Sequence, residues 1–196
     1  TFFWKSKDIT MTSLDIHFLH GFGMVGQHSE NITMDDVDFE APKESGRTTA
    51  GYADFVQMSG CKGTINISNC TFAGPHDDPI NIHGTFNTVT AISSDRRTIT
   101  VQYNHNETAG FPNFFEGDEI EFMTKGNMIT VEDSVRTVTK VDGPDGMGGN
   151  MGDGSGSLTT IKLTLNEAVP SDVQVNQHVV ENITYTPTVN ITNCEF

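Results

Sequence analysis

The sequence has few basic residues, and this scarcity excludes two classes of partner. It contains 11 Lys and Arg against 26 Asp and Glu, which gives a formal net charge of −15. A surface of this sign repels the phosphates of nucleic acids and anionic lipid headgroups, so neither is an expected partner. An uncharged ligand meets no such repulsion.

Long apolar runs are also missing. No stretch approaches the roughly 20 apolar residues that a membrane-spanning helix needs, so we expect no membrane insertion. We also expect no signal peptide within these residues. The chain opens on strand-like sequence at residues 1–4 and stops at Phe196 in the middle of a repeat unit, and we therefore expect a fragment cut at both ends.

Cysteine is scarce, and helical patterning is nearly absent. Cys61, Cys70 and Cys194 form no CxxC pair and have no histidine cluster beside them, so we interpret them as buried structural thiols. No stretch of ten residues keeps the apolar stripe of a helix, while Gly, Asn and Thr recur throughout the chain. These patterns predict an all-β protein.

The sequence does contain an internal repeat. Four segments share one alternating apolar pattern with a polar corner between two short strands, and they begin at Ile9, Ile32, Ile65 and Val189. The longer interval before the third segment is explained by a polar excursion at residues 40–49. Coils of about 20–29 residues are too short for a helical crossover but suit a solenoid. We predict a right-handed parallel β-helix.

The pattern changes between the third and fourth segments. We interpret residues 86–182 as a small antiparallel β-barrel inserted between two coils, and residues 142–157 within it as a Gly-rich loop. Residues 1–85 are then β-helix coils that carry the functional site, and residues 183–196 return to the β-helix. The strands expected in the insertion are residues 87–92, 98–103, 118–123, 135–141 and 158–165.

One string matches a dinucleotide-binding fingerprint without its context. Gly21, Gly23 and Gly26 fit G-x-G-x-x-G, but the sequence that follows predicts a strand where that site needs a helix. We interpret the three glycines as positions of a tight bend and of close packing between coils.

Acidic residues recur at one place in adjacent coils. Asp54 precedes Asp77 by 23 residues and Asp78 by 24, which is one coil. Aligning the alternation of the two strands places Asp54 and Asp78 about 4.8 Å apart on one face. Such stacking is costly unless one acid is protonated or a cation is bound, and acids held in this way concentrate at functional sites. All three are candidate catalytic residues.

Two other interpretations of these acids stay open. Asp-Asp-Pro is good turn sequence, and the cluster also has the chemistry of a structural Ca²⁺ site. Polar side chains nearby suit contacts with sugar hydroxyls and extend the candidate site: His76, Asn81 and His83 around the acid pair, and Gln27 and Arg47 near the same edge.

The sequence around the acids resembles the family 110 glycoside hydrolases. The resemblance covers about residues 20–122 and rests on SGR at 45–47, ADF at 53–55, SGCKG at 59–63, HNETAGFPNFF at 105–115 and above all HDDPINIHGT at 76–85. The chain departs from the family pattern at Phe86 and Asn87, where His and Leu are expected, and this leaves linkage and leaving-group preference open.

The resemblance implies an exo-acting α-galactosidase on a parallel β-helix with an inserted barrel. Such an enzyme removes terminal α-1,3-linked galactose with inversion and without a metal or other cofactor. Galactose-terminated glycans would be its partners. We expect an extracellular or periplasmic protein, and the sequence is compatible with an oligomer.

An inverting glycosidase needs a carboxylate that activates water and a carboxylic acid that protonates the leaving oxygen. Asp77 and Asp78 are the candidates for the base. Asp54 is the first candidate for the acid. Glu107 and Glu116 lie in a segment that could fold back over the site, and they are further candidates for the acid or for substrate contacts.

Two other classes of function stay open. A calcium-dependent polysaccharide lyase-type β-helix would act on an acidic polysaccharide, and the charge of −15 with few basic residues beside the acids argues against it. A non-catalytic β-helix that binds glycan or forms a stalk would tolerate removal of the acids with little effect on binding.

Overall fold

The computed structural model describes residues 1–196 except 106–107, 109–110 and 145–158. The described residues divide into two compact units, unit 1 (Thr1–Gly84 with Tyr185–Phe196) and unit 2 (Thr85–Thr184). They hold fifteen strands and two short 3-10 turns but no α-helix, so the all-β prediction is confirmed. No helix in this described part is long and apolar enough to cross a membrane.

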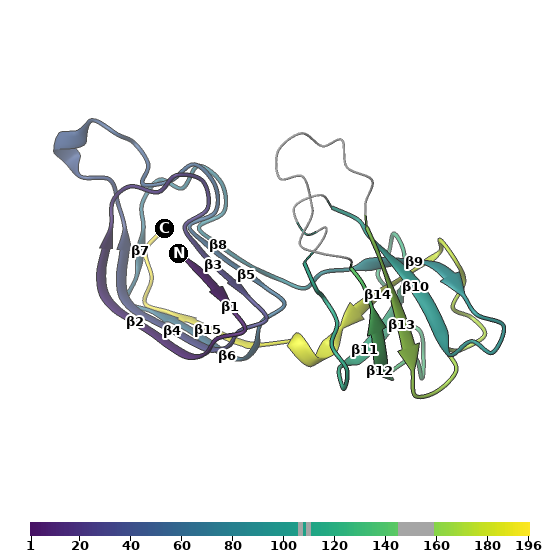
Figure 1. The fold of residues 1–196 in the computed structure, drawn as a ribbon. Helices are drawn as coiled ribbons and strands as arrows, with labels where there is room; N and C mark the ends of the chain where they lie inside the picture. The colour runs from purple at the N-terminus through teal and green to yellow at the C-terminus, as the bar shows by residue number, and fades with distance from the viewer. Residues whose placement is uncertain (106–107, 109–110, 145–158) are drawn as a thin grey trace. The chain divides into compact units, whose positions relative to one another are not determined.

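Unit 1 consists of two parallel sheets whose strands alternate along the chain (Figure 1). Sheet A has the order β1-β3-β5-β8, and sheet B has the order β15-β6-β4-β2 with β7 beside β4. Each turn of the chain therefore adds a strand to each sheet. The strands are β1 Phe2–Trp4, β3 Met24–Gln27, β5 Val56–Ser59 and β8 Ile80–His83 in sheet A, and β2 Lys7–Ile16, β4 Glu30–Phe39, β6 Lys62–Ser68, β7 Thr71–Phe72 and β15 Thr188–Thr192 in sheet B.

The four segments with the shared apolar pattern are neighbouring strands of sheet B. Ile9 pairs with Ile32, and Ile32 pairs with Ile65, in parallel register. Val189 also pairs with Ile65, although the whole of unit 2 lies between them in the chain. The strand that follows the insertion therefore resumes the stack in the register that the sequence pattern predicts.

The polar corner of each segment turns at a residue with left-handed backbone geometry. The φ angles are 53° at Ser13, 58° at Asp36, 55° at Asn69 and 52° at Asn193. Asp and Asn tolerate this conformation better than other non-glycine residues. The Asn193 amide also donates a hydrogen bond of 2.6 Å to Asn69 Oδ1, so neighbouring corners are linked as well as stacked.

A column of phenylalanine rings runs through the core of unit 1. The ring centroid of Phe39 lies 5.2 Å from that of Phe55 and 5.3 Å from that of Phe72, and Phe72 lies 5.5 Å from Phe196. The interplanar angles lie between 8° and 15°, so the rings are stacked. Phe39, Phe55 and Phe72 are fully buried, which makes this column the centre of the apolar core.

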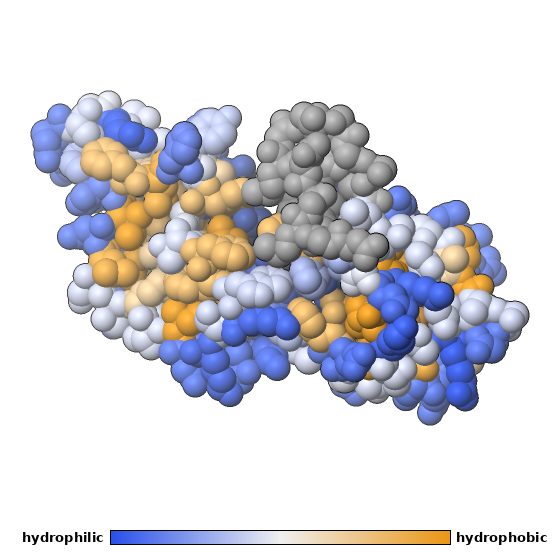
Figure 2. Space-filling model, viewed as in Figure 1, coloured by the Kyte–Doolittle hydropathy of each residue, from blue (hydrophilic) through white to orange (hydrophobic). Residues whose placement is uncertain are grey.

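The core of unit 1 is less completely covered where β1 and β2 form one end of the stack. Phe3, Ile9 and Ile16 pack against the core there but are only partly buried. Figure 2 shows apolar residues gathered over this end of unit 1. The side chains of the next turns, which have neighbours on both sides, are fully buried.

Unit 2 is a closed antiparallel barrel with the strand order β10-β13-β12-β11-β14-β9 (Figure 1). The five strands expected in the insertion are confirmed to within two residues, with a tight turn at residues 94–97. A sixth, β14, was not predicted, and it closes the barrel between β11 and β9. The bounds are β9 Asn87–Ile92, β10 Thr98–Tyr103, β11 Glu119–Thr124, β12 Arg136–Asp142, β13 Thr160–Leu165 and β14 His178–Asn182.

Most of the predicted Gly-rich loop lies outside the described residues, so its interpretation stays a prediction. The described strand β12 ends at Asp142, and β13 begins at Thr160.

Elsewhere in unit 2, the guanidinium of Arg96 donates to the carbonyl oxygens of Val169, Pro170 and Val173. These bonds tie the β9–β10 turn to the segment that leads into β14.

The glycines of the G-x-G-x-x-G string have the packing roles predicted for them. Gly21 has a φ of 91°, which suits a tight bend. A Cβ atom added at Gly23 would collide with the backbone carbonyl oxygen of Phe55, and one added at Gly26 would lie 2.5 Å from Met58 Sδ. Phe55 and Met58 belong to the next turn of the chain, so both glycines permit close packing between coils.

The cysteines also match their interpretation in part. All three lie in the described part of the chain and are free; Cys61 and Cys70 are buried, and Cys194 is half-buried. Burial raises the pKa of Cys61 to about 11, and it also raises the pKa of Cys70. Cys61 and Cys70 are therefore buried structural thiols, whereas Cys194 is only partly covered.

Gly23→Ala is expected to destabilise unit 1 by about 1–3 kcal/mol, because the new methyl group meets rigid backbone. Gly26→Ala should cost less, because the Met58 side chain can rotate away. Trp4 is the only tryptophan and lies in unit 1, so urea unfolding followed by its fluorescence measures both variants. An equal or larger loss in Gly26→Ala would contradict the packing described here.

Glu181→Gln is expected to stabilise unit 2 at pH 7 by about 0.2–1 kcal/mol. Burial, followed by repulsion from Glu121 on the paired strand, raises the pKa of Glu181. The wild-type fold therefore favours the protonated acid, and this contribution is lost as the pH rises through the raised folded-state pKa. The advantage of the variant should shrink as the pH falls toward the unfolded value of about 4.3.

Thermal unfolding followed by circular dichroism between pH 4 and 8 measures this difference. Glu119→Gln is the matched control, because Glu119 lies exposed on β11, the strand that also carries Glu121. A stabilisation by Glu181→Gln that is independent of pH, or equal to that of the control, would contradict the assignment.

Cys61 is expected to resist iodoacetamide at pH 8 in the folded protein. With a pKa of about 11, only about one thiol in a thousand is ionised at that pH, and the sulfur is buried as well. Mass spectrometry of native and urea-unfolded samples measures the labelling of each cysteine, with the half-buried Cys194 as the internal comparison. Labelling of Cys61 as fast as Cys194 in the native protein would overturn this expectation.

Candidate active site

Three aspartates meet where strands β5 and β8 begin. Asp54 lies two residues before the start of β5, and Asp77 and Asp78 lie just before the start of β8. One carboxylate oxygen from each residue lies within 4.8 Å of the other two. Asp54 is buried, at 5% exposure, while Asp77 and Asp78 are exposed. The site therefore has one enclosed acid and two acids that are open to solvent.

The parallel pairing of β5 with β8 brings the acids together. Val56 pairs with Ile80, which is the spacing of 24 residues predicted from the sequence. The pairing extends one step before the strands, because the Phe55 N–H donates to the Asp78 carbonyl oxygen at 3.1 Å. On the other side, the Gly23 N–H donates to the Asp54 carbonyl oxygen at 2.9 Å. Both backbone segments that hold the acids are thus fixed by neighbouring coils.

The strict alternation of inward and outward side chains that is expected for β5 does not extend back to Asp54. Its neighbour Phe55 points into the core, and β5 begins only after it. Asp54 Oδ2 instead accepts a hydrogen bond of 3.1 Å from Asn81 Nδ2. Ile80 and Ile82, on either side of Asn81, pack against the core, so Asn81 lies on the outer face of sheet A. The Asp54 carboxylate therefore reaches the outer face.

Histidine and amide side chains continue this outer face. His83 Nδ1 lies 2.8 Å from the Gly84 carbonyl oxygen, so Nδ1 carries the proton. His83 Nε2 is then an acceptor for the Gln57 side-chain amide at 3.5 Å. Gln57 pairs with Asn81 across the strands, and the spacing of one coil from Asn81 could have identified it. Sequence reasoning missed Gln57.

Gln27 contributes an unpaired acceptor to the same face. It pairs with Ser59, which pairs in turn with His83, so the three lie in one row across β3, β5 and β8. Its side-chain oxygen Oε1 is buried and has no hydrogen-bond partner among the residues that the structure describes. A ligand hydroxyl is a suitable donor for this oxygen.

His76 lies directly before the acid pair and stacks on a second exposed ring. The His76 and Tyr52 ring centroids are 4.9 Å apart with an interplanar angle of 25°. His76 Nδ1 also donates to the Tyr52 carbonyl oxygen at 2.9 Å. Tyr52, which sequence reasoning did not single out, is 72% exposed.

The remaining candidate residues are Arg47, Glu107 and Glu116, and of these Arg47 belongs to the same unit as the acids. The Arg47 guanidinium is 5.1 Å from the centroid of the Phe18 ring, on an exposed loop of unit 1. Glu116 is an exposed residue of unit 2, and Glu107 lies outside the described residues. The structure thus brings together Asp54, Asp77, Asp78 and Asn81, places Gln27 and His83 on the same face, and adds His76 at its edge.

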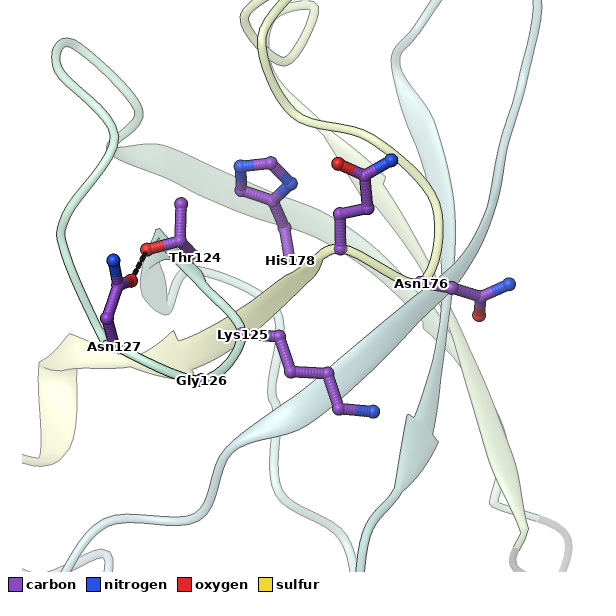
Figure 3. A pocket seen from close by; sticks show the side chains of 7 residues that line it. Thr124, Lys125, Gly126, Asn127, Asn176 and His178 are labelled. Atoms are coloured by element: carbon purple, nitrogen blue, oxygen red, sulfur yellow. Dashed lines mark hydrogen bonds between the residues drawn. The ribbon is translucent and has the colours of Figure 1, made fainter.

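A separate pocket of about 560 Å³ lies in unit 2 at one end of the barrel (Figure 3). Seven residues line it: Thr124, Lys125, Gly126, Asn127, Asn176, Gln177 and His178. Thr124 donates to Asn127 within it, and the Lys125 side chain extends away from both. The pocket contains no carboxylate and none of the residues predicted from the sequence, so it is not the acid site.

Comparison with known proteins finds a match to part of unit 2 and relatives of the whole chain. The family model described as GLAA-B beta-barrel domain II matches residues 98–144, which lie in unit 2. The chain is 49% identical over 195 residues to Alpha-1,3-galactosidase A of Streptomyces avermitilis, covering 100% of this chain and 30% of the relative. It is 41% identical over 193 residues to Alpha-1,3-galactosidase A of Bacteroides thetaiotaomicron, covering 98% of this chain and 31% of the relative.

A more distant relative is Alpha-1,3-galactosidase B of Bacteroides thetaiotaomicron, which is 28% identical over 196 residues, covering 100% of this chain and 29% of the relative. The described part of the chain is thus all-β, and its barrel contains the residues that match this family model. It is homologous along its whole length to part of the curated α-1,3-galactosidases, which confirms the resemblance to that glycoside hydrolase family. The chain spans about 30% of the length of these relatives.

Proposed function

We propose that this chain is part of a glycoside hydrolase that removes terminal α-1,3-linked galactose from glycans by an inverting, metal-independent mechanism. The observation that carries the proposal is the cluster of Asp54, Asp77 and Asp78, whose oxygens lie within 4.8 Å of one another. The names of the homologous proteins supply the galactose and the linkage. Because the chain spans about 30% of those relatives, the activity is proposed for the full-length protein.

We further propose that unit 1 is a segment of a right-handed parallel β-helix. The alternation of successive strands between two parallel sheets supports this. In this scheme, residues 1–85 carry the active site, residues 86–182 are an inserted barrel, and residues 183–196 return to the β-helix. The continuous register from Ile65 to Val189 is what an insertion between two coils requires.

The proposed mechanism divides the acids by their exposure. Asp77 and Asp78, which are open to solvent, activate the water. Asp54 is the general acid: its Oδ2 is held by Asn81, so its Oδ1 holds the proton that passes to the glycosidic oxygen. The polar groups of the outer face, including Gln27 and His83, bind the hydroxyls of galactose.

The spacing of the acids bears on the stereochemistry. Carboxyl groups of inverting enzymes lie about 6.5–9.5 Å apart, and those of retaining enzymes lie about 5–5.5 Å apart. The 4.8 Å limit bounds the distance between one oxygen of each acid, and it does not give the mean separation of the carboxyl groups. The spacing alone does not select inversion, and the anomer of the first product decides it.

The proposed partners and location follow from the same assignment. Galactose-terminated glycans are the partners, in an extracellular or periplasmic location, with no nucleic acid and no membrane insertion. Arg47, His76, Glu107 and Glu116 are proposed as further substrate contacts. An oligomer is compatible with this scheme.

A calcium-bound cluster is the second candidate, and the three converging carboxylates favour it. Carboxylate oxygens are preferred Ca²⁺ ligands, and a cation would relieve the repulsion among the acids. A calcium-dependent lyase or a purely structural Ca²⁺ site would then replace the hydrolase. This candidate differs from the first in its need for metal.

Asp78→Asn in the full-length protein is expected to lower hydrolysis of Gal-α1,3-Gal by about 10²–10⁴-fold, because it removes a carboxylate that activates water. The wild type should release β-galactose first, and EDTA should leave its rate unchanged. NMR of the fresh product measures rate and anomer together. Asp15→Asn is the control, because Asp15 is exposed on sheet B, and it should keep the wild-type rate.

Each alternative gives a different result in this experiment. Release of α-galactose first would replace inversion with retention. A rate that falls with EDTA and returns with Ca²⁺ would support the calcium candidate. Unchanged hydrolysis in both Asp78→Asn and the double variant with Asp77→Asn would remove these aspartates from the mechanism, and no hydrolysis by the wild type would favour a non-catalytic β-helix.

A further inference from the structure

An exposed aromatic ring lies at the edge of the acid site. Tyr52 is 72% exposed, which is unusual for a large ring that is held in one orientation. Two contacts hold it: the His76 ring stacks on it at 4.9 Å, and His76 Nδ1 donates to its carbonyl oxygen at 2.9 Å. The ring is therefore a fixed apolar surface that faces solvent.

The ring and the acids are positioned by the same two backbone segments. Tyr52 lies two residues before Asp54, and His76 lies directly before Asp77. The hydrogen bond from the Phe55 N–H to the Asp78 carbonyl oxygen joins these segments next to the acids. The Tyr52–His76 stack is a second connection between the two segments, so the Tyr52 ring keeps a fixed position relative to the acids.

The chemistry of the ring suits a sugar. The face of a pyranose that carries axial C–H groups is apolar, and it packs on an aromatic face as other apolar groups do. The phenolic hydroxyl at the edge of the ring can donate to or accept from a sugar hydroxyl. A stacked sugar would remove from water the part of Tyr52 that the fold leaves exposed.

The position of the ring points to the sugar on the leaving-group side of the cleaved bond. Terminal galactose must reach the acids and the half-buried polar groups of the outer face, such as Asn81 and His83. Asp54, the proposed general acid, protonates the oxygen that joins galactose to the next sugar. Tyr52 is two residues from this acid and exposed at the rim, which is where that next sugar extends into solvent.

We propose that Tyr52, held by His76, forms a binding subsite for the leaving-group sugar, which is a pyranose with an apolar face. This inference rests on the proposed function. It adds that the enzyme prefers substrates whose leaving group is a sugar. Tyr52 binds the sugar, and His76 serves the binding of the leaving-group sugar as a positioning residue that orients the ring.

The test compares two substrates in the full-length protein. Gal-α1,3-Gal has a sugar as its leaving group, and α-galactosyl fluoride has none. Tyr52→Ala should lower kcat/KM for the disaccharide by about 10-fold, mainly through KM, and change that for the fluoride by less than about 2-fold. Tyr52→Phe keeps the ring and should retain most of the disaccharide activity.

Two further variants separate binding from folding. His76→Phe keeps the stack but loses the Nδ1 hydrogen bond, and it should show a smaller loss that is again confined to the disaccharide. Ile129→Ala removes an exposed apolar side chain in unit 2 and should leave both substrates unaffected. Fluoride hydrolysis also serves as the measure of correct folding for each variant.

Three results overturn the inference, and they can be told apart. Equal losses on both substrates in Tyr52→Ala would mean that the ring contacts galactose itself or supports the fold. An unchanged rate on the disaccharide would mean that the ring binds no leaving group. Failure of the wild type to hydrolyse either substrate would overturn the proposed function, and the subsite with it.

Discussion

Parallel, in-register pairing between consecutive turns of unit 1 is the constraint on which the rest of the structure depends. It places each residue beside its counterpart one coil away, and apolar positions therefore form columns such as Ile32 beside Ile65 and the stacked rings of Phe39 and Phe72. Stacking of this kind buries large rings without helices. It also explains why Gly23 and Gly26 have no side chain, because neighbouring coils fill that space.

The same pairing creates the candidate site. Because equivalent positions of neighbouring turns lie side by side, acids at such positions also come together, as Asp54, Asp77 and Asp78 do. Like charges at this distance repel one another and oppose folding unless a proton, a cation or a ligand offsets them. Asn81 donates an amide hydrogen bond to this cluster, and the same face carries the buried acceptor Gln27 Oε1, which has no partner among the described residues. These features are what a site for a hydroxyl-rich ligand requires.

The core of unit 2 is formed in a different way. Its barrel closes all six strands on themselves, so it has its own core and needs no neighbouring coil. The interruption does not disturb unit 1, because β15 pairs with β6 in the register of the earlier coils. A closed barrel can therefore lie in the chain between two neighbouring strands of sheet B.

Local patterns in the sequence determined the strands, the coil spacing and the corners, because alternation and left-handed Asn or Asp positions are properties of short segments. The spacing of one coil was enough to place Asp54 beside Asp78. Only the tertiary structure decided what depends on contacts between distant segments. It turned Asp54 out of the alternation toward Asn81, closed the barrel with β14, and stacked Tyr52 on His76. Side-chain direction outside a regular strand is set by neighbours on other coils, and no local pattern encodes those neighbours.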